Sequence, residues 1–204
     1  MLSLDHFAVS AETLDAGTTY VEEALGVRLQ DGGNHPLMGT HNRLLGLANG
    51  LYLEVIAIDP DAPKPDRARW FGLNSFEGRP RLTNWIARTD DLTAAVAASP
   101  DGTGVPIALT RGDLRWQMAV PEDGKLPFDG FYPALIEWEG AAHPAERLTQ
   151  SGCTLKRFEV AHPNANALKD ALNPLLQDDR LRIVEGEPSI WAEFDTPNGP
   201  RSLR

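Results

Sequence analysis

Cysteine is nearly absent from this sequence, since Cys153 is the only one among 204 residues. A single cysteine excludes an internal disulfide bond and is typical of proteins from a reducing compartment. The sequence also lacks the basic and apolar N-terminal segment of a secretory signal, because Asp5 and His6 follow the start almost at once. These absences lead us to expect a cytoplasmic protein.

Long apolar runs and an excess of positive charge are also missing. No stretch approaches the roughly 20 apolar residues that a membrane-spanning helix requires. The 19 Lys and Arg residues stand against 29 Asp and Glu, which gives a formal net charge of −10. Because such a surface repels phosphate groups, the sequence predicts binding neither to nucleic acid nor to a membrane. A small-molecule substrate or ligand is the partner that we expect.

An internal repeat organises the first two thirds of the chain. Residues 4–27 align without gaps on residues 82–105, and the alignment places Leu14 on Leu92 and Gly26-Val27 on Gly104-Val105. Each copy begins with a short β-type run and continues through a polar cluster into a helical segment. The helix of the first copy ends at Gly26, and that of the second copy runs from Thr93 to Ala98. Three strand candidates follow in each copy. The sequence therefore predicts the order β-α-β-β-β twice.

A third and more divergent copy starts at Leu155, where LKRFEV lines up with LDHFAV from the start of the chain. Helical and strand signals follow it in the same order. We therefore expect a first module over residues 1–60, a linker over 61–80, a second module over 81–140 and a third over 141–204.

The β-α-β-β-β repeat resembles the vicinal oxygen chelate superfamily, which includes glyoxalase I, extradiol dioxygenases and fosfomycin-resistance proteins. The segment GGNHPLMGTHNRLL, residues 32–45, resembles the signature of its glyoxalase-like subfamily. The resemblance covers residues 2–140 well and the rest moderately. It implies an α+β fold in which tandem βαβββ modules form a cup-shaped half-barrel of mixed strands with the helices outside. The aromatic residues Trp70, Phe71 and Phe76 need burial, so the linker is expected to pack over the cup.

The resemblance also implies a set of metal ligands. LDHFAV is similar to the first-strand motif, with His6 as ligand, and LYLEVIAIDP is similar to the fourth-strand motif, with Glu54 as ligand. The repeat then matches Leu53-Glu54-Val55 to Ile136-Glu137-Trp138, which makes Glu137 the third ligand. Asn84 stands where the family has a second histidine, and its amide is a weak ligand for transition metals. Two interpretations stay open: a divalent Mg, Mn, Fe, Ni or Zn ion bound by His6, Glu54 and Glu137, or a metal-free cavity lined by these groups.

Five further polar residues are candidates for binding a substrate. His35, Thr40 and Asn42 lie in a segment dense in turn-forming residues, which predicts either a simple loop or polar groups at the mouth of the cup. Asn84 and His143 complete the set, since both fall at positions that the resemblance places near the cavity.

The resemblance implies a glyoxalase-like enzyme that acts on a small carbonyl or vicinal-oxygen compound. A metal-assisted isomerase or lyase would use Glu54 or Glu137 as a base. The alternative is a metal-free protein of the same fold that binds or sequesters a small molecule. Because cups close by pairing modules, the third module is expected either to cap the cup or to pair with another chain in a homodimer.

Overall fold

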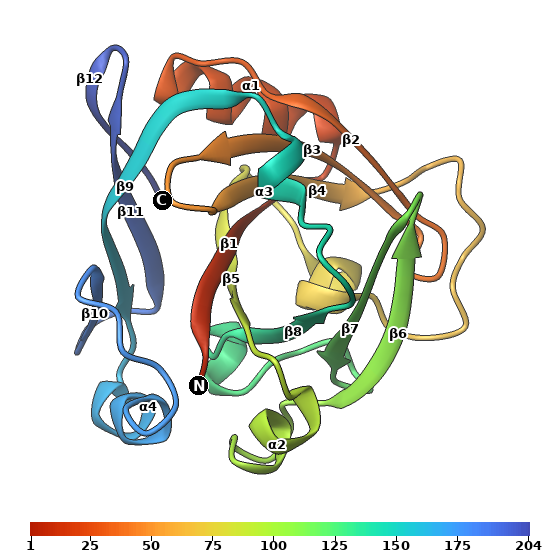
Figure 1. Cartoon of the computed structure of the whole chain (residues 1–204), viewed down its shortest axis with the longest axis vertical. Coiled ribbons are helices and arrows are strands. Elements are labelled where there is room, and N and C mark those ends of the chain that lie inside the picture. Colours follow the sequence, from red (N-terminus) through yellow and green to blue (C-terminus); the bar gives the residue numbers. More distant parts are fainter.

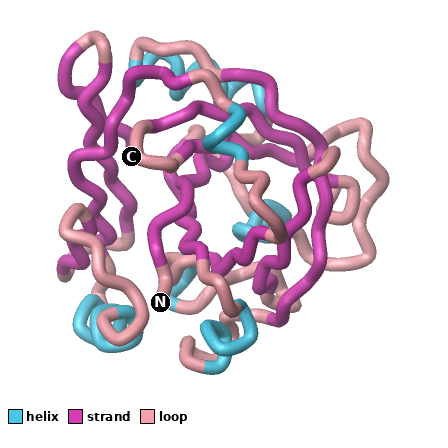
Figure 2. Tube along the Cα trace, viewed as in Figure 1, coloured by secondary structure: helices cyan, strands magenta, loops and turns pink.

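Strands dominate the computed structural model, which describes all residues from 1 to 204 (Figure 2). They form one continuous sheet of twelve strands in the order β12-β11-β9-β3-β4-β1-β5-β8-β7-β6, with β2 added on β3 and β10 on β9. None of the helices has the length and apolar character needed to cross a lipid bilayer. The elements are β1 (Ser3–Ser10), α1 (Leu14–Leu25), β2 (Gln30–His35), β3 (Thr40–Leu47), β4 (Tyr52–Ile58), η1 (Trp70–Ser75), β5 (Arg81–Arg88), α2 (Leu92–Ala97), β6 (Val105–Arg111), β7 (Leu114–Val120), η2 (Phe128–Gly130), β8 (Ala134–Trp138), α3 (Pro144–Arg147), β9 (Gln150–Ala161), α4 (Ala165–Leu172), β10 (Leu181–Val184), β11 (Ser189–Thr196) and β12 (Gly199–Leu203).

The first two modules are built alike and meet at the middle of the sheet. In each module the first strand pairs in parallel with the last one, β1 with β4 and β5 with β8. The two first strands pair antiparallel with each other and so join the modules. In Figure 1 the strands of both modules curve around an open ring, with η1 inside it and α1 and α2 outside. The predicted α+β fold with tandem modules forming a cup is therefore confirmed.

Alternation along the strands gives the cup two different faces. On β1, Phe7 and Val9 point into a large apolar cluster on the convex side, whereas Ala8 belongs to a second cluster inside the cup. On β4, Val55 belongs to the cluster on the convex side and Ile56 to the cluster inside the cup. Because side chains alternate with a period of two, the polar residues at even positions of these strands are directed to the inside.

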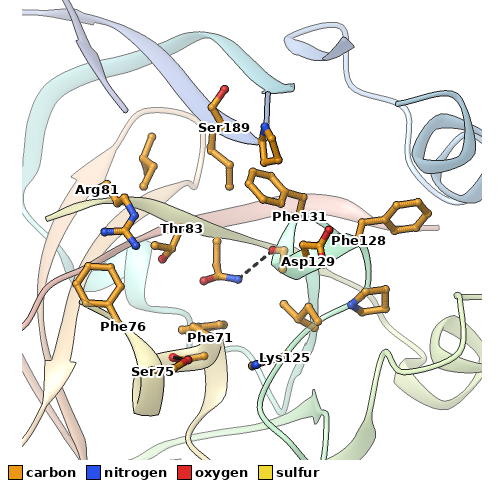
Figure 3. Close-up of a pocket in the computed structure, with 18 of the residues that line it drawn as sticks. Phe71, Ser75, Phe76, Arg81, Thr83, Lys125, Phe128, Asp129, Phe131 and Ser189 are labelled. Carbon is orange, nitrogen blue, oxygen red and sulfur yellow. Dashed lines mark hydrogen bonds between the residues drawn. The ribbon is translucent and has the colours of Figure 1, made fainter. Parts of the chain in front are cut away.

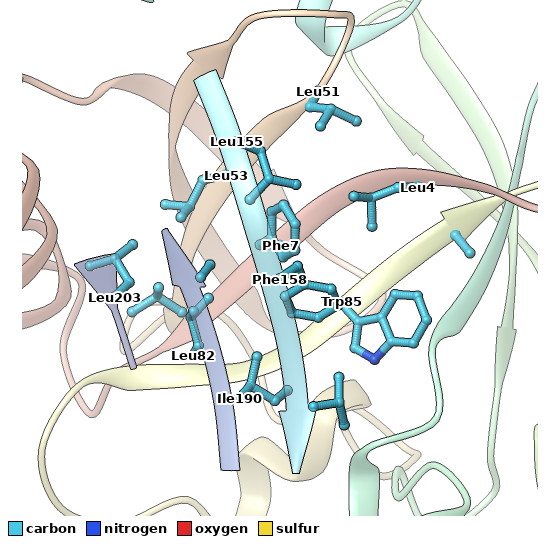
Figure 4. Packing of buried hydrophobic residues seen from close by; sticks show 14 of the residues in the cluster. Leu4, Phe7, Leu51, Leu53, Leu82, Trp85, Leu155, Phe158, Ile190 and Leu203 are labelled. Atoms are coloured by element: carbon cyan, nitrogen blue, oxygen red, sulfur yellow. The ribbon is translucent and has the colours of Figure 1, made fainter. Parts of the chain in front are cut away.

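The larger cluster of 33 buried residues lies between the convex face and the third module. Figure 4 shows Phe158 of β9 lying against Phe7 of β1 and Trp85 of β5. The ring of Phe158 is 4.8 Å from that of Phe7 and 5.3 Å from that of Trp85. The third module therefore covers the back of both other modules in the same chain. A homodimer stays a prediction.

The third module keeps the element order of the other two modules but pairs its strands differently. Its first strand, β9, pairs in parallel with β10 and antiparallel with β11, and β12 pairs only with β11. The start of β9 also pairs with β3, which makes the small sheet a continuation of the cup. The third module therefore repeats the order of the elements but not the pairing of the strands.

Part of the linker between the first two modules fills the inside of the cup. Trp70, Phe71 and Leu73 of η1 are buried in the inner cluster, together with Met38 and Trp116. The backbone of Phe71 has a φ of 57°, in the left-handed region that is uncommon for a residue with a side chain. The aromatic residues of this segment thus form a wall in the cup.

Candidate functional site

A small buried chamber remains between the linker and the strands of the cup. Its cavity volume is about 20 Å³, which is room for one water molecule. Besides apolar and indole side chains, six polar or titratable residues line it: His6, His35, Asn42, Tyr52, Glu54 and Arg111. Such a concentration of polar side chains in the interior is costly unless they satisfy one another.

His6 and Glu54 form the centre of the chamber. They come from the neighbouring parallel strands β1 and β4, and His6 Nε2 lies 3.6 Å from Glu54 Oε1. The other carboxylate oxygen, Oε2, accepts a hydrogen bond of 2.8 Å from Asn42 Nδ2. The ring of Tyr52 stacks on the imidazole with a centroid distance of 4.2 Å. Packing and hydrogen bonds therefore fix both groups in place.

Asp5 holds the opposite side of the His6 ring. The strand pairing between β1 and β5 is irregular at this point, and the fully buried Asp5 side chain lies alongside its neighbour's ring. Asp5 Oδ1 is 2.5 Å from His6 Nδ1, and Oδ2 is 3.0 Å from His143 Nε2. Trp138 Nε1 donates to the same Oδ2 at 3.2 Å. A carboxylate on Nδ1 sets the orientation of the imidazole and directs Nε2 toward Glu54.

This network shifts the pKa values of Asp5, His6 and Glu54 toward their charged forms. Burial opposes ionisation of Asp5, but hydrogen bonds from His143 and His6 outweigh it and hold the pKa of Asp5 well below its usual value. Burial likewise opposes the charge on Glu54, yet its contact with His6 lowers the pKa of Glu54 overall. Burial would lower the pKa of His6, but the contacts with Asp5 and Glu54 raise it instead. The contacts thus favour an imidazolium between two carboxylates.

Arg111 brings a second cation to the chamber from the second module. It lies at the end of β6, and its Nη1 donates to Asn42 Oδ1 at 3.1 Å. The same Nη1 is 3.4 Å from His35 Nε2, while His35 Nδ1 is 3.1 Å from Thr40 Oγ1. Burial, assisted by the charge of Arg111, lowers the pKa of His35 to about 4. The pKa values of the two histidines are therefore shifted in opposite directions, that of His6 upward and that of His35 downward.

The two histidines are expected to titrate in opposite directions from the usual value of 6.5. In imidazole NMR spectra assigned with His6→Gln and His35→Gln variants, His35 should stay neutral until the pH falls to about 4, and His6 should stay charged above pH 6.5.

Between pH 4 and 6.5 the unfolded chain then binds a proton at His35 that the folded protein does not. The free energy of unfolding should therefore fall by up to about 3 kcal/mol as the pH drops through this range, and His35→Gln should remove that slope. Equal titration of both histidines near 6.5 would contradict the assignment.

The structure brings five of the residues predicted from the sequence to this chamber or its supports. His6, Glu54, His35 and Asn42 line it, and Thr40 contacts His35 from behind. His143 does not line the chamber but supports it from outside, through the carboxylate of Asp5 and through ring contacts with Tyr52 and Trp138.

Glu137 and Asn84 are not brought to the chamber. Glu137 lies on the convex side, where its Oε2 accepts a hydrogen bond of 2.7 Å from the backbone N–H of Leu92 at the start of α2. Asn84 Nδ2 donates to the carbonyl of Gly130 at 3.2 Å, and this side chain lines a different cavity. The prediction that Glu137 completes a ligand set with His6 and Glu54 therefore disagrees with its position in the structure.

A register error explains the misplacement of Glu137. Glu54 pairs with Ala8, and Ala134 pairs with Ile86. Because Ile86 lies 78 residues after Ala8, which is the shift of the repeat, the counterpart of Glu54 is Ala134. Glu137 is three residues beyond that position and, by strand alternation, points to the opposite face.

The donor set does not fit the metal site that the resemblance implies. His6 Nε2 and Glu54 Oε1 are 3.6 Å apart, a distance that two ligands of the same metal ion can have. These two residues alone, however, supply only two of the ligands that an ion needs. The two counterpart positions in the second module hold Ala134, which has no donor, and Asn84, which faces elsewhere. No group of three or more His, Cys, Asp or Glu side chains is arranged to hold a metal ion. A structural or catalytic ion usually has three or four protein ligands.

Sequence reasoning missed three residues of the site, Asp5, Arg111 and Tyr52, and expected a fourth, Trp70, only as part of a linker packed over the cup. Asp5 stands directly before His6, and a carboxylate next to a candidate histidine in an apolar strand was a signal for it. Arg111 belongs to the turn Arg111-Gly112-Asp113 and carries no mark of function in the sequence, because only the closure of the cup brings it near His35. Tyr52 and Trp70 resemble ordinary core residues, although Trp70 Nε1 is a buried donor without a hydrogen-bond partner.

Comparisons with known proteins agree with the fold. A family model described as "Glyoxalase-like domain" matches residues 4–176. A solved structure of a hypothetical protein from Staphylococcus aureus is 19% identical, with a TM-score of 0.65 over 93% of this chain and 88% of that chain. Methylmalonyl-CoA epimerase from Mycobacterium tuberculosis is 18% identical over 68% of this chain and 88% of its own, with a TM-score of 0.43. A variant of the corresponding enzyme from Streptomyces coelicolor, in complex with 2-nitronate-propionyl-CoA, is 16% identical over 68% of this chain and 97% of its own, with the same TM-score of 0.43. No curated protein matches the chain.

Proposed function

The chain belongs to the glyoxalase-like domain family, and from this premise we propose that it is an isomerase or lyase that moves a proton at the carbon next to a carbonyl group. The observation that supports this most directly is Glu54. It is a carboxylate only 5% exposed, kept ionised, and placed in a chamber with two histidines and an arginine. Buried groups with shifted pKa values cluster at functional sites.

Glu54 is the proposed base. Its carboxylate takes the proton from the carbon next to the carbonyl, the C–H electron pair moves to form the enolate, and the carbonyl oxygen becomes negative. Return of the proton to a carbon completes an isomerisation. His6 has a positioning role, because Asp5 fixes its ring and its charge keeps Glu54 ionised between turnovers.

Arg111 and Trp70 are the proposed partners of the substrate oxygen. The guanidinium of Arg111 lines the chamber and would stabilise the negative charge of the enolate. The indole N–H of Trp70, which has no partner in the structure, supplies a further donor in the same lining. A divalent ion would supply this charge stabilisation as a Lewis acid in the metal-assisted interpretation. Because the donor set does not fit such an ion, the proposal assigns that role to Arg111.

Solvent exchange tests the proposal without knowledge of the product. The full-length protein is incubated in D₂O and excess EDTA with a panel of small 2-oxo acids, hydroxyketones and thioesters, and deuterium uptake next to the carbonyl is measured by mass spectrometry. We expect catalysed uptake with at least one class of compound in the presence of EDTA. Uptake that requires an added divalent ion would contradict the role given to Arg111. Binding of a panel compound without any uptake would instead support the alternative of a binding protein.

A further inference from the structure

A second and much larger cavity lies beside Asn84, and we call it the outer pocket. Its volume is about 930 Å³, within the range of small-molecule sites. Figure 3 shows Phe76, Phe71 and Lys125 along one side of it and Phe128 and Phe131 on another. Residues 188–190 of the third module close a further side. The pocket is therefore shaped by all three modules and by the linker.

The lining of the outer pocket is rich in aromatic rings. Phe76, Phe128 and Phe131 are only half-buried, and Phe71 contributes a fourth ring. Such apolar rings exposed in a concave site gain free energy when an apolar molecule covers them. The guanidinium of Arg81 already lies over the ring of Phe76, 4.3 Å from its centroid.

The charges around these rings favour an anion. Arg81, Lys125 and Arg204 line the pocket against two acids, Asp123 and Asp129. Asp123 accepts a hydrogen bond from the backbone N–H of Lys125, and Asp129 Oδ2 lies 3.5 Å from His162 Nε2.

Two cations at this site have no partner, Lys125 and Arg204. Arg81 donates to the carbonyls of Glu77 and Arg79, whereas the side chains of Lys125 and Arg204 make no hydrogen bond and no ion pair. An aromatic lining with a free ammonium group at its edge suits a ligand that is apolar over most of its length and negative at one end.

Phe71 connects the outer pocket with the chamber, because it is the one residue that lines both cavities. The chamber itself has room for little more than a water molecule, so a carbonyl compound must displace part of its wall. Phe71 is a suitable part of the wall to move, since its φ of 57° is a strained backbone conformation that a rearrangement would relieve.

We propose that the outer pocket binds an amphipathic anion, with its apolar body on the phenylalanine rings and its negative group at Lys125. The inference rests on the proposed function in one respect: it takes this molecule to be the substrate, whose carbonyl end reaches Glu54 past Phe71. The binding itself is independent of any chemistry in the chamber and is measured separately.

Titration with 8-anilinonaphthalene-1-sulfonate tests the binding, because this probe is an amphipathic anion that fluoresces in apolar surroundings. We expect saturable binding to the folded full-length protein. Lys125→Gln should weaken it about three- to fivefold, the effect of losing one exposed ion pair. Binding of the uncharged probe N-phenyl-1-naphthylamine should not respond to this substitution. Phe76→Ala should weaken the binding of both probes.

Lys64→Gln is the matched control, because Lys64 is exposed like Lys125 but lies outside the pocket. Unfolding midpoints of all variants show whether the probe reports on the folded state. The inference is overturned if the folded protein does not bind the sulfonate, or if either Lys125→Gln or Phe76→Ala binds it as tightly as the wild type. Probe binding without proton exchange in the EDTA assay would reject the chemistry and keep the pocket. Proton exchange without probe binding would support the chemistry in the chamber and reject the outer pocket as the binding site.

Discussion

Replacing Glu54 with Gln is expected to slow deuterium uptake by the best panel compound by about 10² to 10⁴-fold, the usual contribution of a general base. The amide has nearly the same size and can still accept a hydrogen bond from Asn42, so the chamber keeps its shape. It cannot accept a proton from carbon, and it removes the negative charge that faces His6. The same mass-spectrometric assay in D₂O gives the rate.

Glu137→Gln is the control for this prediction. Both glutamates lie in apolar strands and the sequence treats them as equivalent, but only Glu54 lines the chamber. The amide that replaces the Glu137 carboxylate keeps an oxygen for the backbone N–H of Leu92, so uptake should stay within about twofold of the wild type. Equal losses in the two variants would show that the sequence-based pairing of the glutamates was right and their placement in the structure wrong. Unchanged uptake in Glu54→Gln would remove Glu54 as the base.

Phe158→Ala is expected to lower the free energy of unfolding by about 3 to 5 kcal/mol, as large-to-small changes at fully buried aromatic residues do. The ring of Phe158 is fully buried and contacts Phe7 of the first module and Trp85 of the second. Its removal leaves a cavity where all three modules meet. Urea unfolding followed by tryptophan fluorescence and by circular dichroism measures the change.

Phe76→Ala supplies the comparison, because Phe76 is half-buried at the outer pocket and its removal should cost less than about 1.5 kcal/mol. If the third module is an integral part of the core, the fluorescence and dichroism transitions coincide in wild type and variant. Two separate transitions, or a loss below about 1 kcal/mol for Phe158→Ala, would mean that the third module folds as a unit of its own.

Local patterns were sufficient to predict the order of elements in this fold. The β-type runs, the polar clusters before the helices and the glycine stop at Gly26 are properties of short segments, and the structure has strands and helices in the expected β-α-β-β-β order. The linker aromatics had to be buried somewhere, and the inside of the cup is where Trp70 and Phe71 lie.

Long-range pairing decided the features that the sequence did not predict. A match of three residues, Leu-Glu-Val to Ile-Glu-Trp, was outweighed by the pairing of Ala134 with Ile86, and this register turned Glu137 away from the cup. The irregular pairing beside Asp5 brings that carboxylate to His6, which strict alternation does not foresee. Arg111 reaches His35 across 76 positions of the chain, and no local pattern carries that information.

The pairing of Ala8 with Glu54 and of Ile86 with Ala134 has a consequence for the symmetry of the chain. The strand pairings relate the backbones of the first two modules by a near-twofold axis, but His6 and Glu54 lie in the first module only. The second module has Asn84 and Ala134 at the corresponding positions. It contributes Arg111 to the chamber and part of the wall of the outer pocket. A nearly symmetric backbone therefore carries an asymmetric set of polar groups, so the two halves of the cup are not interchangeable.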